Sequence, residues 1–408
     1  MTTAIIITLC SLLLIAYVFD LTSSKTKIPS VILLLLLGWI VRQLSVFFSV
    51  GIPDLSALLP ILGTVGLILI VLEGSLELEL NKSKTTIIIK SFVVAFLPML
   101  TLAFSLAALF HYLGSFPFKN CLANAIPLCV ISSAVAIPSV KNLNPFNKEF
   151  IIYESSLSDI LGVLFFNFIT MNDTIDMHSF GGFTLELLIM IAISFVATIA
   201  LAFLLNKIEH HIKFVPIILL IILIYAIAKE YHLPALIFIM VLGLFLGNLD
   251  ELKHIKWIKK FNPDELNKEI HKFRELTIEI TFLIRTLFFL LFGYLIETSE
   301  ILNLDTVAWA AATVAIIFII RWIQLKLLKL PIKPLLFIAP RGLITILLFF
   351  SIPLIQNISL VNKSYVIQVI ILTALVMMAG FMFIKETVVT EARAESLDEN
   401  NLDTAVFD

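Results

Sequence analysis

Long apolar runs, separated by short gaps that carry most of the charges, constrain this 408-residue chain more than any other feature of its sequence. A helix needs roughly 20 apolar residues to cross a bilayer, and runs of that length follow one another along almost the whole chain. Only 14% of the residues are charged, against about 25% in a soluble domain. We therefore predict an all-α polytopic membrane protein, and exclude a soluble enzyme and a nucleic-acid-binding protein.

The hydropathy pattern predicts thirteen transmembrane helices. They are expected at residues 3–20, 28–48, 57–80, 85–112, 120–140, 150–170, 183–206, 213–229, 233–248, 276–298, 304–328, 333–356 and 363–385. The first run has no basic segment before it and no small-residue cleavage site after it. We therefore predict a retained span rather than a signal peptide.

Lysine and arginine are distributed unevenly between the two sides that this count implies. The gaps after odd-numbered spans and the C-terminal tail hold 20 of the 28 basic residues, and the gaps after even-numbered spans hold four. Basic residues stay preferentially on the cytoplasmic side of a membrane. The bias predicts an N-terminus outside the cell and a C-terminus in the cytoplasm, in a protein of the plasma membrane.

Two segments are not expected to span the membrane. Residues 249–275 mix apolar side chains with many lysines, which predicts an amphipathic linker on the cytoplasmic face. Residues 386–408 form a short acidic tail that we expect to be disordered. The tail is too short for a nucleotide-binding domain, which argues against an ATP-driven pump. The cysteines (Cys10, Cys121 and Cys129) show no spacing typical of disulfides or zinc sites.

Six ionisable residues lie well inside the predicted spans, where charges are costly and usually functional. They are Glu73, Glu154, Asp159, Arg285, Arg321 and Arg341. With a rise of 1.5 Å per helical residue, all six fall between the midplane and the cytoplasmic side. A shared depth predicts one site built from several spans. The alternative for any single residue is an ion pair that only joins two helices.

The sixth predicted span contains the most informative motif, ESSLSD at residues 154–159. Helical spacing places Ser155, Ser158 and Asp159 on one face. A carboxylate and two hydroxyls are hard oxygen ligands suited to a small cation. Serines in membrane helices also bond to their own backbone or permit close packing, and the sequence leaves that alternative open. Glu154 lies at the edge of this face and is expected to need an arginine partner.

The fifth and twelfth spans are predicted to be broken. SSAVAIP (132–138) contains Ser132 and Ser133 before Pro138, and APRGLIT (339–345) contains Pro-Arg-Gly. Irregular backbone is tolerated in a membrane only where it is buried in protein or lines a cavity. Broken spans in corresponding positions of two inverted repeats mark transporter binding sites, here repeats of spans 4–6 and 11–13. The alternative is a proline that merely kinks each helix.

These motifs, in this order, resemble the monovalent cation:proton antiporter superfamily, the sodium/proton exchangers. The similar segments, spread over about residues 28–385, are IPSVILLLLLG (28–38), LILIVLEGSLEL (67–78), SSAVAIP, ESSLSD, LPALIFIMVLGLFLGN (233–248), FLIRTLFFLLFG (282–293), FIIRWIQLKLL (318–328) and APRGLIT. The resemblance implies a homodimer with an inverted-repeat antiporter fold. It also implies an elevator-like core (about 85–170 and 304–385) that moves against a scaffold (about 3–80 and 183–298).

The resemblance also implies roles for single residues. Asp159 would be the carrier carboxylate, Ser155 and Glu73 would be neighbours of the cation, and Glu154 would pair with Arg321. Two positions depart from the family pattern. Ser158 stands where Asn or a second Asp is usual, and Ser132-Ser133 stands where Thr-Asp is frequent, so the selectivity between Na⁺, K⁺ and Li⁺ stays open. We count Ser158, Ser132 and Ser133 as further candidate ligands, and Arg341 and Arg285 as compensating charges.

The expected chemistry is competition between a proton and a monovalent cation for Asp159. It requires no cofactor, no nucleotide and no enzymatic step; the partners are the cation, H⁺, the lipid bilayer and a second copy of the chain. Ser158 cannot ionise, and arginine does not release its proton. One proton per cation, and therefore electroneutral exchange, is expected. The alternative is a transport-inactive sensor or scaffold that keeps the antiporter fold.

Overall fold

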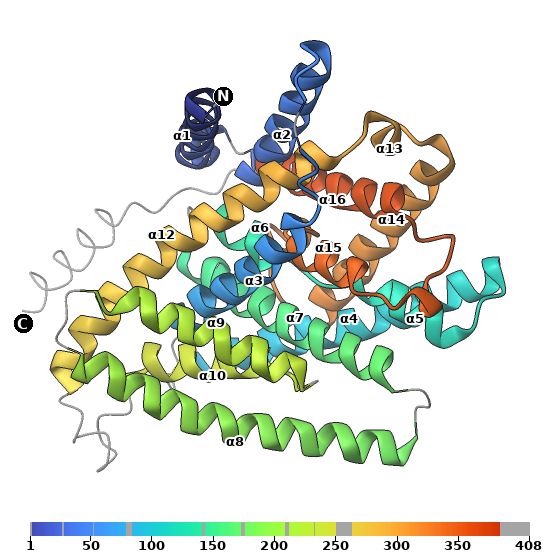
Figure 1. Ribbon diagram of the computed structural model, residues 1–408. Helices are drawn as coiled ribbons and strands as arrows, with labels where there is room; N and C mark the ends of the chain where they lie inside the picture. The colour runs from blue at the N-terminus through green and yellow to red at the C-terminus, as the bar shows by residue number, and fades with distance from the viewer. Residues whose placement is uncertain are drawn as a thin grey trace, which may run out of the picture.

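The computed structural model describes residues 2–26, 28–51, 53–78, 84–140, 143–172, 176–208, 212–231, 233–249 and 263–383. In these ranges the chain is helical and contains no strand (Figure 1). The acidic tail, 386–408, and residues 250–262 of the predicted linker lie outside the described residues.

Helices in the first half of the chain follow the predicted apolar runs. They are α1 (Thr2–Thr26), α2 (Ser30–Phe47), α3 (Leu58–Glu77), α4 (Thr85–Gly114), α5 (Phe118–Ala125), the short 3₁₀ turn η2 (Ile126–Leu128), α6 (Ser133–Ser139) and α7 (Pro145–Met171). Asn144 caps α7, because its side chain accepts a hydrogen bond from the Asn147 amide.

The second half is built in the same way. It comprises α8 (Met177–Lys207), α9 (Phe214–Glu230), α10 (Leu236–Gly247), α12 (Pro263–Leu295), α13 (Thr298–Ile301), α14 (Leu304–Leu327), the 3₁₀ turn η4 (Leu335–Phe337), α15 (Leu343–Phe350), the 3₁₀ turn η5 (Leu354–Gln356) and α16 (Lys363–Phe383). Every predicted span therefore contains helix.

Nine helical stretches within the described ranges are long and apolar enough to cross a membrane. The chain is a multi-pass membrane protein, and the count of thirteen spans stays a prediction. α9 and α10 are short, with 17 and 12 residues, and α7 carries the polar ESSLSD motif. Length and hydropathy alone do not identify such helices.

The tenth predicted span begins earlier than expected. The sequence predicted an amphipathic linker over residues 249–275, and α12 is helical from Pro263. The first turns of α12 therefore form part of that segment, and its place on the cytoplasmic face stays a prediction. Ion pairs hold these polar first turns to neighbouring helices. Glu269 contacts Lys213 at 2.5 Å, and Arg274 contacts Glu77 at the end of α3 at 3.1 Å. The helix therefore continues beyond its apolar part because its charged turns have partners.

Two groups of helices can be distinguished by their contacts. In one group, α12 lies along α2 and α3, and α10 packs on α3 and α8 (Figure 1). In the other group, α4 packs on α5, α7 and α14, α6 packs on α7, and α14 packs on α16. The groups hold the helices predicted as scaffold and as core, and movement of one against the other stays a prediction.

Close packing in the first group depends on glycine. A Cβ on Gly293 would collide with the backbone of Leu35, and a Cβ on Gly38 would lie 2.8 Å from the amide nitrogen of Tyr294. α2 and α12 thus approach backbone to backbone, as small residues permit between membrane helices. The closely packed pair of α2 and α12 lies next to the centre of the molecule, where α6 and α15 are found (Figure 1).

Candidate ion-binding site

Two interrupted segments meet at the centre of the protein. Helical structure stops at Leu128 and resumes at Ser133, and it stops again at Phe337 and resumes at Leu343. The Ser132 amide donates a hydrogen bond of 2.9 Å to the carbonyl oxygen of Pro340, which joins the two interruptions directly. One backbone group freed by each break therefore finds its partner in the other.

Gly342 makes this crossing possible. A Cβ at this position would lie 2.8 Å from Cγ2 of Val135 and 2.9 Å from Oγ of Ser132. Both distances are shorter than real side chains allow, so a larger residue would separate the two segments. In this Pro-Arg-Gly sequence, Pro340 interrupts the helix and Arg341 carries the charge. Gly342 allows the two backbone segments to approach each other closely.

Asp159 lies on α7 beside this crossing and is 1% exposed. Its Oδ2 accepts hydrogen bonds from the Ser133 amide, at 3.3 Å, and from the Ser133 hydroxyl. Ser133 is the first residue of α6, so the carboxylate faces the positive end of a half-helix. Its Oδ1 has no hydrogen-bond partner among the described residues. Buried polar atoms usually have a hydrogen-bond partner, so this carboxylate oxygen is available to bind a cation or a proton.

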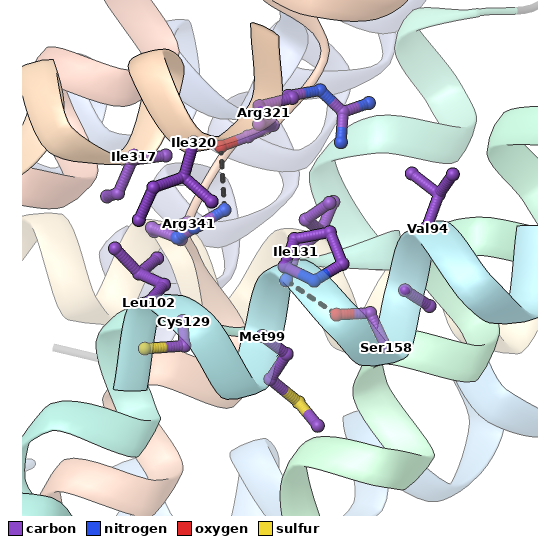
Figure 2. Close-up of a pocket in the computed structure, with 13 residues that line it drawn as sticks. Val94, Met99, Leu102, Cys129, Ile131, Ser158, Ile317, Ile320, Arg321 and Arg341 are labelled. Atoms are coloured by element: carbon purple, nitrogen blue, oxygen red, sulfur yellow. Dashed lines mark hydrogen bonds between the residues drawn. The ribbon is translucent and has the colours of Figure 1, made fainter. Parts of the chain in front are cut away.

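The serines around Asp159 have different surroundings. The Ser158 hydroxyl accepts a hydrogen bond of 2.9 Å from the Ile131 amide, inside the first interruption (Figure 2). The Ser155 hydroxyl donates to the Ile151 carbonyl oxygen at 2.7 Å, one turn earlier in its own helix, which is the backbone bonding that the sequence left open. Oγ of Ser132 is buried and has no partner among the described residues.

Glu73 lies on α3, which packs against α7. Its neighbour Gly74 faces Ser156 of α7, and a Cβ on Gly74 would lie 2.8 Å from Oγ of Ser156. The half-buried Glu73 therefore belongs to the stretch of α3 that adjoins the ESSLSD motif. The structure therefore brings helix α3 next to α7 at the ESSLSD motif.

Glu154 and Arg321 form a buried ion pair. Nη1 and Nη2 of Arg321 lie 2.5 Å and 2.9 Å from the two carboxylate oxygens of Glu154. The two side chains are 0% and 3% exposed. Nε of Arg321 donates to the Leu335 carbonyl oxygen at 2.8 Å. The pair joins α7 to α14, and it also fixes the turn η4 before the second interruption.

Arg341 is buried as well, but it binds backbone rather than a carboxylate. Its Nε donates to the Leu128 carbonyl oxygen at 2.7 Å, and its Nη1 donates to that of Ala339 at 3.0 Å. Its amide donates to the Thr373 hydroxyl at 3.1 Å. These partners were not predicted, because backbone carbonyls and a lone threonine on α16 carry no recognisable signal in the sequence.

Arg285 does not join this cluster. It lies on α12, it is 8% exposed, and it forms no hydrogen bond or ion pair with the described part of the chain. The structure thus brings together five of the six predicted membrane charges around α3, α7 and the two interruptions. Arg285 belongs to the group of helices that contains α2 and α12.

A small cavity lies between α4, α14 and the first interruption (Figure 2). Its volume is about 20 Å³, and its polar lining is Ser158, Arg321, Arg341 and Cys129, which is room for a single water molecule. Asp159 does not line it. Elsewhere in the described residues, no group of three or more His, Cys, Asp or Glu side chains could hold a metal ion.

The family model for "Sodium/hydrogen exchanger, transmembrane" matches residues 9–385. Two structures of the sodium proton antiporter MjNhaP1 from Methanocaldococcus jannaschii have a similar fold. One, at pH 8, gives a TM-score of 0.64 with 17% identity over 93% of this chain and 97% of that chain. The other, from electron microscopy, gives 0.64 with 20% identity over 93% and 95%. No curated protein sequence matches.

Proposed function

The chain belongs to the sodium/hydrogen exchanger family, and from this premise we propose that it exchanges a monovalent cation for H⁺ across the membrane. Na⁺ is the first candidate cation, and K⁺ and Li⁺ are the others. One observation carries the proposal: Asp159 is buried beside the crossing, Ser133 holds one of its oxygens, and the other has no partner among the described residues.

Proton and cation compete for this carboxylate. When the proton is bound, Asp159 is neutral; when the cation is bound, the charges cancel. The empty carboxylate is a buried, uncompensated charge, and its desolvation makes that form unfavourable. Only the two loaded forms therefore cross between the sides, which couples the movement of one ion to the return of the other.

The proposed ligand shell uses oxygen atoms of several elements. Oδ1 of Asp159 and Oγ of Ser132 are two of the buried oxygens that have no partner among the described residues, and we propose Glu73 of α3 as a further ligand. Ser133 orients the carboxylate. Ser155 and Ser158 remain candidate ligands through the lone pairs that their backbone bonds leave free, and Ser158 also holds the first interruption in place.

We propose alternating access by an elevator-like movement of the core, α4–α7 and α14–α16, against the scaffold. The two interrupted segments act as discontinuous membrane spans inside that core. The protein works as a homodimer in the plasma membrane, with its N-terminus outside and its C-terminus in the cytoplasm. Support for the orientation comes from the uneven distribution of lysine and arginine.

The test is cation-dependent proton movement in proteoliposomes, followed with a pH-sensitive dye while Na⁺, Li⁺ and K⁺ are added in turn. Asp159→Asn should abolish the signal. Asp54→Asn, a matched change at a carboxylate in the exposed loop before α3, should leave it intact. A transport-inactive sensor or scaffold would give no cation-dependent signal in the wild-type protein.

A further inference from the structure

The connection between α12 and α14 is bonded to both groups of helices. Thr298, at the start of α13, accepts hydrogen bonds of 3.2 Å from Nε1 of Trp39 and Nε2 of Gln43, both on α2. From Glu300, within α13, the partner changes. Nε2 of Gln368, on α16, donates to carbonyl oxygens of this connection, the nearest being that of Asn303 at 2.9 Å. The first half of the connection is thus held by α2 and the second half by α16 (Figure 1).

Lys363, the first residue of α16, reaches across this division. Its Nζ donates to the Leu295 carbonyl oxygen at 3.3 Å and lies 2.9 Å from Oε1 of Glu300. Leu295 is the last residue of α12, and the final carbonyls of a helix have no partner within it. They also form the negative end of the helix dipole. A lysine of the core therefore caps a helix of the scaffold.

Below this lysine the seam between the two groups is closed by apolar packing. Phe292 of α12 is 3% exposed. The remaining void is about 10 Å³ and is lined by Phe292, Ile346, Phe349, Phe350, Lys363, Val366 and Ile367. An apolar space of this size does not hold water. Among the described residues, apolar side chains therefore fill this part of the seam under Lys363.

We propose that Lys363 is a latch that stabilises the state closed on this face of the protein. The proposal rests on the proposed function, since alternating access requires the core to move against the scaffold. When this face opens, the start of α16 leaves the end of α12, so the Lys363–Leu295 contact breaks. Loss of the latch shifts the population toward the state open on this face, assigned above to the outside.

Such a shift has opposite effects on the two sides. A cation that binds only the state open to its side gains apparent affinity when that state becomes more populated, and loses it when the state becomes rarer. The contact that breaks is that of Lys363 with the C-terminal end of α12, and the Lys363 side chain is partly exposed. A cation at such a helix end changes the balance of states about threefold. The Michaelis constants for the cation measured from the two faces should therefore move in opposite directions.

Arg42 supplies a matched control, because it makes the same two kinds of contact from the scaffold. Its Nη1 donates to the Tyr294 carbonyl oxygen at 3.3 Å, and its Nη2 lies 3.0 Å from Oε1 of Glu297. Both partners lie at the end of α12, and Arg42 lies on α2 of the same group. Its removal weakens the same region without releasing the core.

The experiment measures the cation Michaelis constant in inside-out and right-side-out vesicles for wild type, Lys363→Met and Arg42→Met. For Lys363→Met we expect a value about threefold lower from the outer face and about threefold higher from the inner face. Arg42→Met should leave the Michaelis constants from both faces at their wild-type values. Equal constants for Lys363→Met and wild type, or the same opposite shift in Arg42→Met, would overturn the latch.

Failure of the latch and failure of the proposed function give different results. Absence of exchange in the wild-type vesicles contradicts the function, whereas wild-type exchange without the opposite shift contradicts only the latch. Lys363→Arg keeps the positive charge of the side chain. The Michaelis constants of this variant from the two faces should therefore match those of the wild type. If Lys363→Met does not fold, Lys363→Gln serves in its place, and the opposite shift must appear there for the proposal to stand.

Discussion

The buried pair of Glu154 and Arg321 allows a quantitative test of the site's architecture. Both nitrogen–oxygen contacts are short, 2.5 Å and 2.9 Å, and both side chains are almost fully buried. Glu154→Gln leaves a buried guanidinium without its counter-charge, and Arg321→Met leaves a buried carboxylate. Removing one member of such a pair costs about 3–5 kcal/mol in the free energy of unfolding.

The double variant separates pairing from packing. With both charges gone, no buried charge is left without compensation, so the double variant should be clearly less destabilised than the sum of the single variants. An unfolding entropy of roughly 2 cal/mol/K per residue, applied to 408 residues, converts the single losses into about 4–6 °C of melting temperature. Thermal unfolding in one detergent, followed by intrinsic fluorescence, measures all four proteins.

An exposed ion pair provides the control. Arg274 and Glu77 lie 3.1 Å apart, and their side chains are 40% and 24% exposed. Pairs of this kind contribute at most about 1 kcal/mol, so Arg274→Met should lower the melting temperature by only about 1 °C. Strictly additive losses for Glu154→Gln and Arg321→Met would refute the pairing as the source of their stability.

Three further changes test the ion site. Asp159→Asn should abolish exchange in proteoliposomes while the melting temperature stays near that of wild type; half the wild-type rate would exclude Asp159 as the carrier. Gly342→Ala should lower the melting temperature and the exchange rate together, because the added Cβ meets Val135 and Ser132, and an unchanged protein would contradict the close crossing. An imposed membrane potential should leave the exchange rate unchanged, and cation uptake driven by potential alone would indicate that a second group, such as Glu73, carries a proton.

Much of this architecture follows from the sequence. Hydropathy placed the helices, because a bilayer requires long apolar segments. The prolines and glycine in 132–138 and 339–345 predicted broken spans. Helical structure is absent at 129–132, just before the first segment, and at 338–342, whereas residues 133–139 are helical and contain Pro138. The resemblance to the antiporter superfamily implied the pairing of Glu154 with Arg321, and their common depth agreed with it. The first two predictions rest on properties that the side chains carry in themselves, and the third rests on the resemblance.

The partners of the serines and of Arg341 could not be predicted in this way. Ser158 accepts from the Ile131 amide, and Arg341 donates to the carbonyl oxygens of Leu128 and Ala339. Every residue carries such backbone groups, so the sequence does not mark those that an interruption leaves free. The early start of α12 at Pro263 has a similar cause, since its polar turns are stabilised by ion pairs with α3 and α9.

The choice of backbone partners for Arg341 leaves Asp159 without an arginine partner among the described residues, as the proposed ion site requires. Counted from the sequence, three acids and three arginines share one depth and could have neutralised one another. In the structure, Glu154 forms an ion pair with Arg321, and Arg341 binds carbonyl oxygens of both interruptions. One of these carbonyls belongs to Leu128, at the end of a helical segment, where partial negative charge is concentrated. No arginine forms an ion pair with Asp159 among the described residues. Its negative charge is therefore left for a proton or a cation to neutralise.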